Sequence, residues 1–306
     1  MMASVSTRAN AMPRRTILLG FDVSQWLAML ALAVVIVLCV FPFWWTISSS
    51  FKTAQEILVG TPKLFPRSLN MVNYDYILSF PGINYIGMFV NSIYVTSFTV
   101  ILYCILCVTS GYGFARVDFR GRDAIFLGLV LLLFVPQAGG LIALYEMMDK
   151  LGLRNNLNGL VLYFASQITV GAFIMRQAFL NLPRELEDAA RIDGAHTFQV
   201  LWHIAIPMVT SAVLVITILE FVNVWGEFLV TYTMIDNQQR MTAAVGYAMV
   251  AASVVTPQLS IAHLANLSIY GTSDASAVIL LLPAVLIYIG LQKWFVQGML
   301  EGILKF

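Results

Sequence analysis

The sequence predicts an all-α membrane protein, and three observations support this fold class. Of the 306 residues, 59% are hydrophobic and only 11% are charged, whereas soluble domains carry roughly 25% charged residues. The mean hydropathy is +0.83. The apolar residues form runs long enough to cross a bilayer as helices, which takes about 20 residues. We therefore expect one transmembrane domain over residues 1–306, with spans at approximately 24–47, 88–114, 124–144, 157–175, 208–235 and 275–296.

The first half of the chain begins with a polar segment, 1–22, that carries three arginines. The apolar run after it exceeds the 7–15 residues of a typical signal-peptide core, so we expect it to be retained as a helix. Residues 51–85 contain several prolines and are expected to be external, with a short helix near 73–78. The second span, 88–114, is rich in small and hydroxyl side chains, as expected where membrane helices pack closely.

The second half begins with a span that Pro136, Gly139 and Gly140 are expected to bend or break. The fourth span leads into a charged loop, residues 181–207, called the 181–207 loop below. The fifth span leads into a second external segment, 236–273, and the sixth precedes a short tail. Two of the three cysteines lie in the second span and one in the first, where small buried apolar residues are expected rather than disulfides or zinc ligands.

Basic residues predict the orientation of these spans. Eleven of the 17 lysines and arginines lie on the side that holds both termini and the 181–207 loop, and six lie on the other side. Cytoplasmic segments carry the excess of basic residues. Both termini and the 181–207 loop are therefore expected to be cytoplasmic.

Composition and motifs also argue against several functions. A net charge of +1 gives no support for nucleic-acid binding. The chain contains no Gly-Lys pair, so it has no Walker-type phosphate loop and is not expected to hydrolyse ATP. The sequence shows no catalytic or metal-ligand arrangement. We expect a non-catalytic protein that binds neither a metal nor a cofactor.

The 181–207 loop reads NLPRELEDAARIDGAHTFQVLWHIAIP and has the pattern of two short helices joined at a glycine. Pro183 suits a first helical turn, and the acidic residues that follow place negative charge near the positive end of that helix. Gly194 is expected to end the first helix in a left-handed conformation, and Thr197 to cap the second. A polar helical pair between membrane spans predicts a docking surface. The alternative is an amphipathic helix on the membrane surface, but such helices usually carry Lys and Arg.

The spacing in this loop resembles the coupling (EAA) loop of permease subunits in binding-protein-dependent ABC importers. That pattern is Glu-Ala-Ala, three residues, Gly, nine residues, then Ile-x-Leu-Pro. Asp replaces Glu at the first position and Ile replaces Leu before the proline. The matching residues here are Asp188, Ala189, Ala190, Gly194, Ile204 and Pro207.

Other segments are similar to the second, six-helix permease of the carbohydrate-uptake, maltose-transporter-type group. They include SSSFKT (48–53), NYDYIL (73–78), NSIYVT (91–96), GYGFAR (111–116), LGLRNN (151–156) and WGEFL (225–229). The resemblance implies a type I importer fold in the plasma (inner) membrane of a bacterium or archaeon. It also implies a second permease subunit, two cytoplasmic ATPase subunits that hold ATP and Mg, an extracytoplasmic sugar-binding protein and a sugar substrate.

In that family the loop inserts into a cleft on the ATPase. Carried over to this sequence, the contact residues are Glu187 together with the matching positions named above. The second helix is expected to present one apolar stripe made of Phe198, Leu201, Trp202 and Ala205. Asp188 takes the position of the carboxylate that pairs with a basic residue of the ATPase.

The fifth span carries a second constellation, Glu220, Asn223 and Glu227, spaced so that all three lie on one helix face. Ionisable groups inside a membrane are costly and are functional candidates by default. Trp225 lies nearby on a different face. Aromatic rings stack on the apolar face of a sugar while carboxylates and amides bind its hydroxyls, so these four residues are predicted to line a substrate pathway. Hydrogen bonding between helices, or hydration of Glu227 near the interface, is the alternative.

The leading hypothesis is thus a permease half of an ATP-driven sugar importer. Similar permeases handle sugar-phosphate or glycerol-phosphate type solutes, which is an alternative substrate class. A proton-driven secondary transporter using Glu220 and Glu227 is a further alternative. Such transporters usually have internal repeats and more spans.

Overall fold

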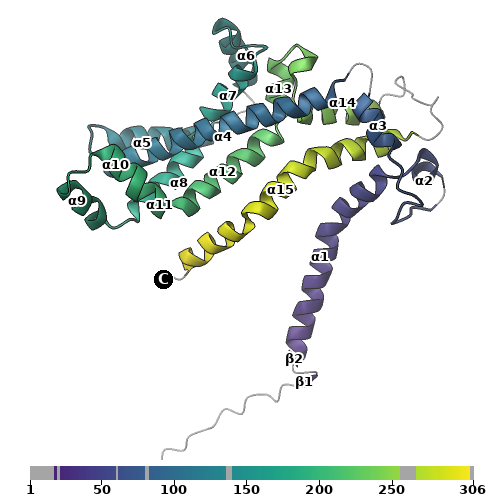
Figure 1. Cartoon of the computed structure of the whole chain (residues 1–306), viewed down its shortest axis with the longest axis horizontal. Helices are drawn as coiled ribbons and strands as arrows, with labels where there is room; N and C mark the ends of the chain where they lie inside the picture. Colours follow the sequence, from purple (N-terminus) through teal and green to yellow (C-terminus); the bar gives the residue numbers. More distant parts are fainter. Residues whose placement is uncertain are drawn as a thin grey trace, which may run out of the picture.

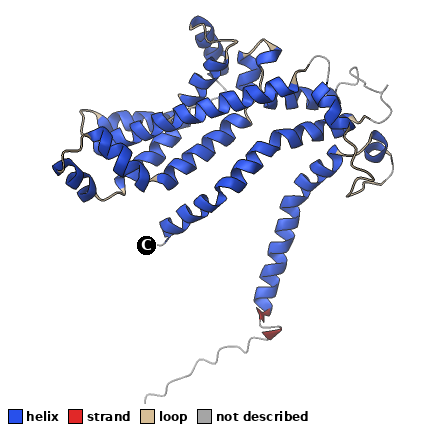
Figure 2. Cartoon of the chain, in the orientation of Figure 1, coloured by secondary structure: helices blue, strands red, loops and turns tan. Residues whose placement is uncertain are grey.

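The computed structural model describes residues 17–18, 21–59, 61–79, 83–135, 140–255 and 267–303. These residues are mainly helical (Figures 1 and 2), which confirms the predicted fold class. A small hairpin precedes the first helix, in which β1 (Ile17–Leu18) pairs antiparallel with β2 (Phe21–Asp22). The sequence prediction contained no strand at this place.

Among the described residues, three unbroken helices are long and apolar enough to cross a membrane: α1 (Val23–Ser50), α4 (Tyr85–Arg116) and α15 (Ile269–Ile303). They correspond to the first, second and sixth predicted spans. Each runs past its predicted limits, and α15 begins inside the predicted external segment 236–273. That segment also contains a 3-10 turn, η4 (Gln238–Arg240), and α14 (Ala243–Val255).

The predicted fourth span, 157–175, is two helices rather than one. Helix α7 (Leu157–Ala165) and helix α8 (Thr169–Leu180) meet at an angle of 44°. At the break, the Ser166 hydroxyl donates to the carbonyl of Tyr163 at 2.7 Å, and the N–H of Gln167 donates to Phe164 instead of Tyr163. A hydroxyl that takes a backbone acceptor competes with the helical hydrogen bond, which accounts for the break.

The predicted third span, 124–144, is also interrupted. Helix α5 (Arg122–Leu131) continues into a 3-10 turn, η1 (Leu132–Phe134), and α6 (Leu141–Lys150) follows. Two of the residues expected to break this span, Pro136 and Gly139, lie outside the described residues. Gly140 immediately precedes α6.

The predicted fifth span, 208–235, ends early. Helix α12 (Thr210–Trp225) stops at Gly226, and α13 (Leu229–Met234) begins after it. The Glu227 carboxylate accepts the backbone N–H groups of Val230 at 2.7 Å and Thr231 at 3.1 Å. Because these donors are the unsatisfied groups at the start of a helix, the carboxylate initiates a new helix here instead of extending α12.

Helix α4 lies at the centre of the bundle. It packs against α8, α7 and α12, and against α14. One group of buried side chains includes Met88 and Leu160, and a second includes Met175 and Phe179. The 181–207 loop lies at one end of α4, and α2 (Ala54–Leu58) and α3 (Val72–Ser79) lie at the other end (Figure 1).

Helix α1 stands apart from this bundle. It contacts α15, but the two helices diverge toward the start of α1 (Figure 1). Its apolar side chains are exposed along most of its length, and Cys39, predicted to be buried, is exposed on it, whereas Cys107 is buried in the bundle. Since every backbone group of a helix is satisfied internally, lipid or another subunit can cover such a surface.

The contact between α4 and α8 requires glycine at position 111, because a side chain there would collide with α8. A Cβ atom there would lie 2.5 Å from the Cβ of Met175 and 3.0 Å from backbone atoms of α8. Two turns of helix cannot approach this closely with a larger residue. Gly113, two residues later on α4, has no atom within 4 Å of its hypothetical Cβ.

We predict opposite effects for alanine at these two glycines. Gly111→Ala overpacks the α4–α8 contact, which typically costs about 1–3 kcal/mol, and should lower the melting temperature of the purified chain in detergent. Gly113→Ala should leave it unchanged or raise it, because alanine is the better helix former by about 0.5–1 kcal/mol. Equal melting temperatures for the two variants would contradict the packing described here.

Candidate functional site

The 181–207 loop folds as two helical pieces around a glycine, as predicted. Helix α9 (Arg184–Ile192) is followed by Gly194 at φ +90°, a left-handed conformation that favours glycine. The Ala195 N–H donates to the Ala190 carbonyl at 2.9 Å and closes the end of α9. The second piece comprises α10 (Thr197–Val200), a π-helical turn η3 (Leu201–Ala205) and α11 (Ile206–Met208).

The cap of α10 differs from the prediction. His196, not Thr197, is the capping residue: its Nδ1 accepts the Gln199 N–H at 3.4 Å, and the Gln199 Oε1 accepts the His196 N–H at 3.0 Å. This reciprocal pair satisfies two donors at the start of the helix. The imidazole nitrogen takes the place of the hydroxyl that the sequence pattern indicated.

Glu187 is buried against α4, although it was predicted to contact the ATPase. Its Oε1 lies 2.8 Å from Nε of Arg116, and the side chains of Arg116 and Glu187 are 4% and 7% exposed. The Tyr112 hydroxyl donates to its Oε2 at 3.1 Å. Arg116 also donates from Nη2 to the Leu182 carbonyl at 2.6 Å. Glu187 is therefore part of an internal attachment of α9 to the end of α4.

This attachment is mainly electrostatic. The Arg116 Nε and Glu187 Oε1 are close but are not aligned as a hydrogen bond. Removing one partner of a buried pair leaves the other charge uncompensated, which typically costs about 3–5 kcal/mol. The GYGFAR segment of α4 thus supplies both residues that hold α9, Tyr112 and Arg116.

The other loop residues that were predicted to contact the ATPase are more exposed than Glu187. Asp188, Ala189, Gly194 and Pro207 are exposed, whereas Ala190 and Ile204 are partly buried. Large apolar side chains of the same loop are exposed beside them: Ile192 is 87% exposed, Phe198 65% and Trp202 59%. The rings of Phe198 and Trp202 stack with centroids 6.3 Å apart. Together these side chains form a surface of apolar and acidic groups, called the loop surface below.

The predicted single apolar stripe on the second helix is wrong. Phe198 and Trp202 are exposed, whereas Leu201 and Ala205 are buried in the core with Met175 and Phe179. The wider π-helical turn over Leu201–Ala205 changes the angular spacing of these residues, so the four side chains divide between two faces. One pair anchors the loop and the other pair is available for contact.

The loop joins the membrane helix α12 through a sharp bend. The axes of the segment Thr197–Met208 and of α12 differ by 81°. Pro207 lies just before the bend, where the ring removes a backbone donor, and Val209 leaves the helical conformation at φ −109° and ψ 21°. Displacement of the loop therefore acts directly on the start of α12.

The polar residues of this region are brought together only in part: the Asn223 side chain interacts with the Glu220 carboxyl, whereas Glu227 lies beyond the end of α12. Glu220 is buried, 4% exposed, and its Oε1 has no hydrogen-bond partner among the described residues. Asn223 is exposed. Glu227 lies beyond the end of α12 and caps α13. The predicted continuous face of Glu220, Asn223 and Glu227 is therefore corrected, because the helix ends between Asn223 and Glu227.

Trp225 is packed between helices of the chain. It is buried, and its Nε1 donates to the Leu280 carbonyl of α15 at 2.8 Å. Its ring stacks on Phe221 at 5.6 Å and meets Phe89 edge-on at 5.7 Å. The indole thus has two aromatic contacts within the chain. This residue joins α12 to α15 and α4, instead of offering a free ring to a substrate.

Comparison with known proteins places this arrangement in context. A family model described as "Binding-protein-dependent transport system inner membrane component" matches residues 1–301. The chain is 29% identical over 287 residues to the arabinooligosaccharides transport system permease protein AraQ of Halalkalibacterium halodurans, covering 92% of this chain and 96% of that protein. It is 28% identical over 270 residues to the trehalose/maltose transport system permease protein MalG of Thermococcus litoralis, covering 88% and 92%.

A solved structure has a similar fold. It is a chain from a bacterial ABC transporter involved in the import of the acidic polysaccharide alginate. The TM-score is 0.80 at 23% identity, and the match covers 89% of this chain and 96% of that chain. The two chains therefore share the same fold over most of their length.

The buried attachment of α9 generates a prediction about Glu187. Glu187→Ala leaves Arg116 without its partner and should release α9, so that backbone amides of 184–192 exchange hydrogen for deuterium much faster. Glu185→Ala removes an exposed carboxylate from the same helix and should leave the exchange unchanged. The double change Glu187→Leu with Arg116→Met removes both charges and should restore part of the protection. Equal exchange in the Glu187→Ala and Glu185→Ala variants would show that the ion pair does not hold the helix.

Proposed function

Because the chain belongs to the family of binding-protein-dependent transport system inner membrane components, we propose that it forms one membrane-spanning half of an ATP-driven importer of oligosaccharides. The chain is the non-catalytic permease subunit of that importer. A second permease completes the pathway, two cytoplasmic ATPase subunits bind ATP and Mg, and an extracytoplasmic binding protein delivers the sugar. Both termini and the 181–207 loop face the cytoplasm.

The construction of the 181–207 loop is the observation that supports this proposal. Its outer side exposes Ile192, Phe198 and Trp202 beside the Asp188 carboxylate. Large apolar side chains on a polar loop are typical of a protein contact. Its inner side is fixed to α4 by the Glu187–Arg116 pair. A partner that moves this surface therefore moves membrane helices.

The path of this motion follows from the two attachments of the loop. Closure of the ATPase dimer displaces α9 and α10 as one unit, because the Gly194 turn between them is closed by hydrogen bonds. The Glu187–Arg116 pair transmits the displacement to α4, and the 81° bend transmits it to α12. These helices pack against each other. The pathway between the two permease halves opens and closes as they move.

Asn223 is the residue that we propose for the pathway surface of this subunit. It is an exposed amide within α12, a helix otherwise composed mainly of apolar residues. An amide offers both donors and an acceptor to sugar hydroxyls. Glu220 lies one turn earlier but is buried, so it supports the helix packing or becomes accessible only when the helices move.

A neutral saccharide is the favoured substrate class. AraQ and MalG, the two relatives described above, are named for transport of arabinooligosaccharides and of trehalose and maltose. This favours oligosaccharides over a glycerol-phosphate type solute. The same relationship favours ATP-driven import over a proton-driven mechanism using Glu220 and Glu227.

Substitutions at Asp188 test the proposed coupling. We expect the complex with its partner permease, ATPases and binding protein, reconstituted in proteoliposomes, to take up at least one of arabinotriose, maltotriose and trehalose only when ATP is present. Asp188→Lys should reduce this uptake by about tenfold or more while ATP hydrolysis by the subunits continues, because it reverses the charge in the contact. Asp188→Glu keeps the charge with one more methylene and should retain uptake.

These measurements test the contact of Asp188 with the ATPase and the importer function separately. Uptake that is unchanged by Asp188→Lys would remove Asp188 from the ATPase contact. Uptake that proceeds without ATP or without ATPase subunits would overturn the importer itself.

A second prediction concerns Asn223. Asn223→Leu should reduce the rate of sugar uptake severalfold without affecting assembly, because it replaces an exposed amide, which also interacts with Glu220, with an apolar side chain of similar size. Val222→Leu changes the neighbouring exposed position and is the matched control. If both variants transport at the wild-type rate, Asn223 does not contact the substrate.

A further inference from the structure

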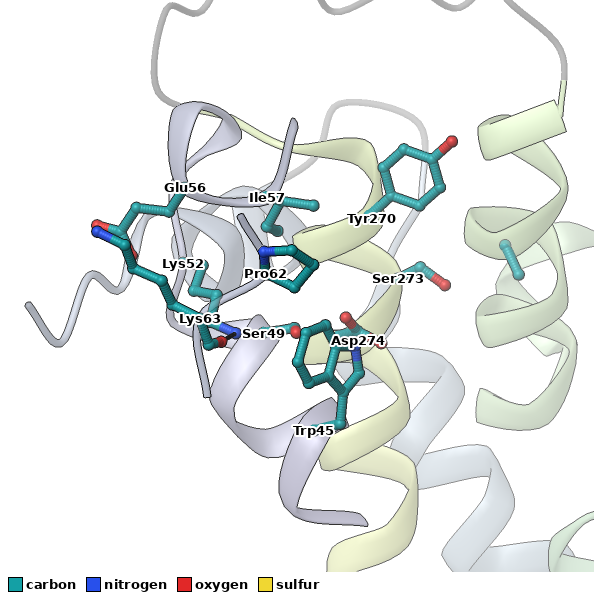
Figure 3. A pocket seen from close by; sticks show the side chains of 11 residues that line it. Trp45, Ser49, Lys52, Glu56, Ile57, Pro62, Lys63, Tyr270, Ser273 and Asp274 are labelled. Carbon is teal, nitrogen blue, oxygen red and sulfur yellow. Dashed lines mark hydrogen bonds between the residues drawn. The ribbon is translucent and has the colours of Figure 1, made fainter. Parts of the chain in front are cut away.

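A cavity lies where the end of α1, the segment around α2 and the start of α15 meet (Figure 3). These elements lie at the far end of the molecule from the 181–207 loop (Figure 1). Its volume is about 380 Å³, within the range of roughly 300–1,000 Å³ that is usual for small-molecule sites. In Figure 3, Trp45 lies at its lower end and Tyr270 at its upper end, with Ser273 and Asp274 on α15.

One wall of the cavity carries a buried lysine. Lys52 is only 2% exposed. Its Nζ donates to the Lys63 carbonyl at 2.6 Å and lies 4.4 Å from the centroid of the Trp45 ring. Burial lowers the pKa of Lys52, and the nearby carboxylates of Glu56 and Asp274 oppose that shift. An ammonium has three N–H donors, and the carbonyl uses one of them.

The opposite wall carries the carboxylate of Asp274. Among the residues that the structure describes, Asp274 makes neither a hydrogen bond nor a close ion pair, although it attracts Lys52 across the cavity. Asp274 is partly buried, and a charge that is taken out of water without a partner is costly. A group placed between the two can accept from the ammonium and donate to the carboxylate. A hydroxyl has both capacities, whereas an ionised carboxylate can only accept and an ammonium can only donate.

The rest of the lining suits a polyhydroxylated ligand with an apolar face. Tyr270 is about half exposed and has a ring face available, while Ser49 and Ser273 bring further hydroxyls to the wall. The charges in the lining are two lysines, Lys52 and Lys63, and two carboxylates, Glu56 and Asp274. This balance favours a neutral ligand over a charged one.

We propose that this cavity is a saccharide-binding subsite that receives one end of an oligosaccharide at the extracytoplasmic end of the permease. The hydroxyls of the sugar bridge Lys52 and Asp274, and its apolar face stacks on Tyr270. The proposal rests on the proposed function, since it names a second place where the same class of substrate is bound. It assigns recognition of the sugar to α15 and the end of α1, separate from Asn223 on α12.

Protection from chemical labelling tests the subsite directly. Ser273→Cys, in a chain whose Cys39, Cys104 and Cys107 are replaced by serine, places one thiol on the cavity wall. The reconstituted complex is treated with a membrane-impermeant methanethiosulfonate, with and without millimolar amounts of the saccharide that the wild-type complex takes up. We expect the sugar to slow labelling severalfold. Tyr270→Ala should abolish the protection, whereas Tyr288→Ala, an exposed tyrosine later on the same helix, should retain it.

Uptake provides an independent measurement. Asp274→Asn keeps the shape of the side chain but removes its charge and should raise the KM for uptake by about tenfold at a similar maximal rate, the pattern of lost binding. Labelling that the sugar leaves unchanged, together with wild-type KM in Asp274→Asn, overturns the subsite while wild-type uptake upholds the proposed function. Protection by the binding protein without sugar would also overturn it, because the cavity would then be a protein contact. Absence of ATP-dependent uptake in the wild-type complex is a failure of the proposed function and is recorded separately.

Discussion

The buried pair of Glu187 and Arg116 is the interaction on which the arrangement of the 181–207 loop depends. It joins a short amphipathic helix, α9, to the longest well-packed helix of the bundle, α4. A nine-residue helix is marginal in water by itself. Its charged, polar composition gives it little apolar surface to bury. An ion pair removed from solvent holds such a helix in one place while leaving its outer side free for a partner.

The same division between inner and outer side chains continues through the second half of the loop. Leu201 and Ala205 enter the core, while Phe198 and Trp202 remain exposed. In a membrane protein, exposed apolar side chains on the spans are covered by lipid, but those on a polar loop are not. Their exposure is typical of a protein contact surface, which supports the proposed docking of another subunit here. Within this one segment, some residues thus attach the loop to the core and others remain available to contact a partner.

At the opposite end of the bundle, the structure favours a second kind of contact. The cavity between α1 and α15 combines charges, hydroxyls and aromatic rings in a small volume. The two ends are connected by α4 and by α12, which itself meets α15 through Trp225. A change at the 181–207 loop can therefore reach the helix that carries Tyr270 and Asp274. This continuity is what an alternating-access mechanism requires of its subunits.

The sequence by itself determined the membrane class, the family resemblance and the helix–glycine–helix form of the 181–207 loop, because these depend on local composition and on spacing along the chain. Only the tertiary structure decided which side chains face inward. Glu187 and Asp188 are adjacent carboxylates with the same local pattern, and the position of Arg116, 71 residues earlier, separates their roles. The partners of Trp225 likewise come from other segments of the chain. The breaks at Ser166 and Gly226, in contrast, are made by local side-chain hydrogen bonds that hydrophobic periodicity does not reveal. A buried contact is a property of two segments, so one segment alone cannot specify it.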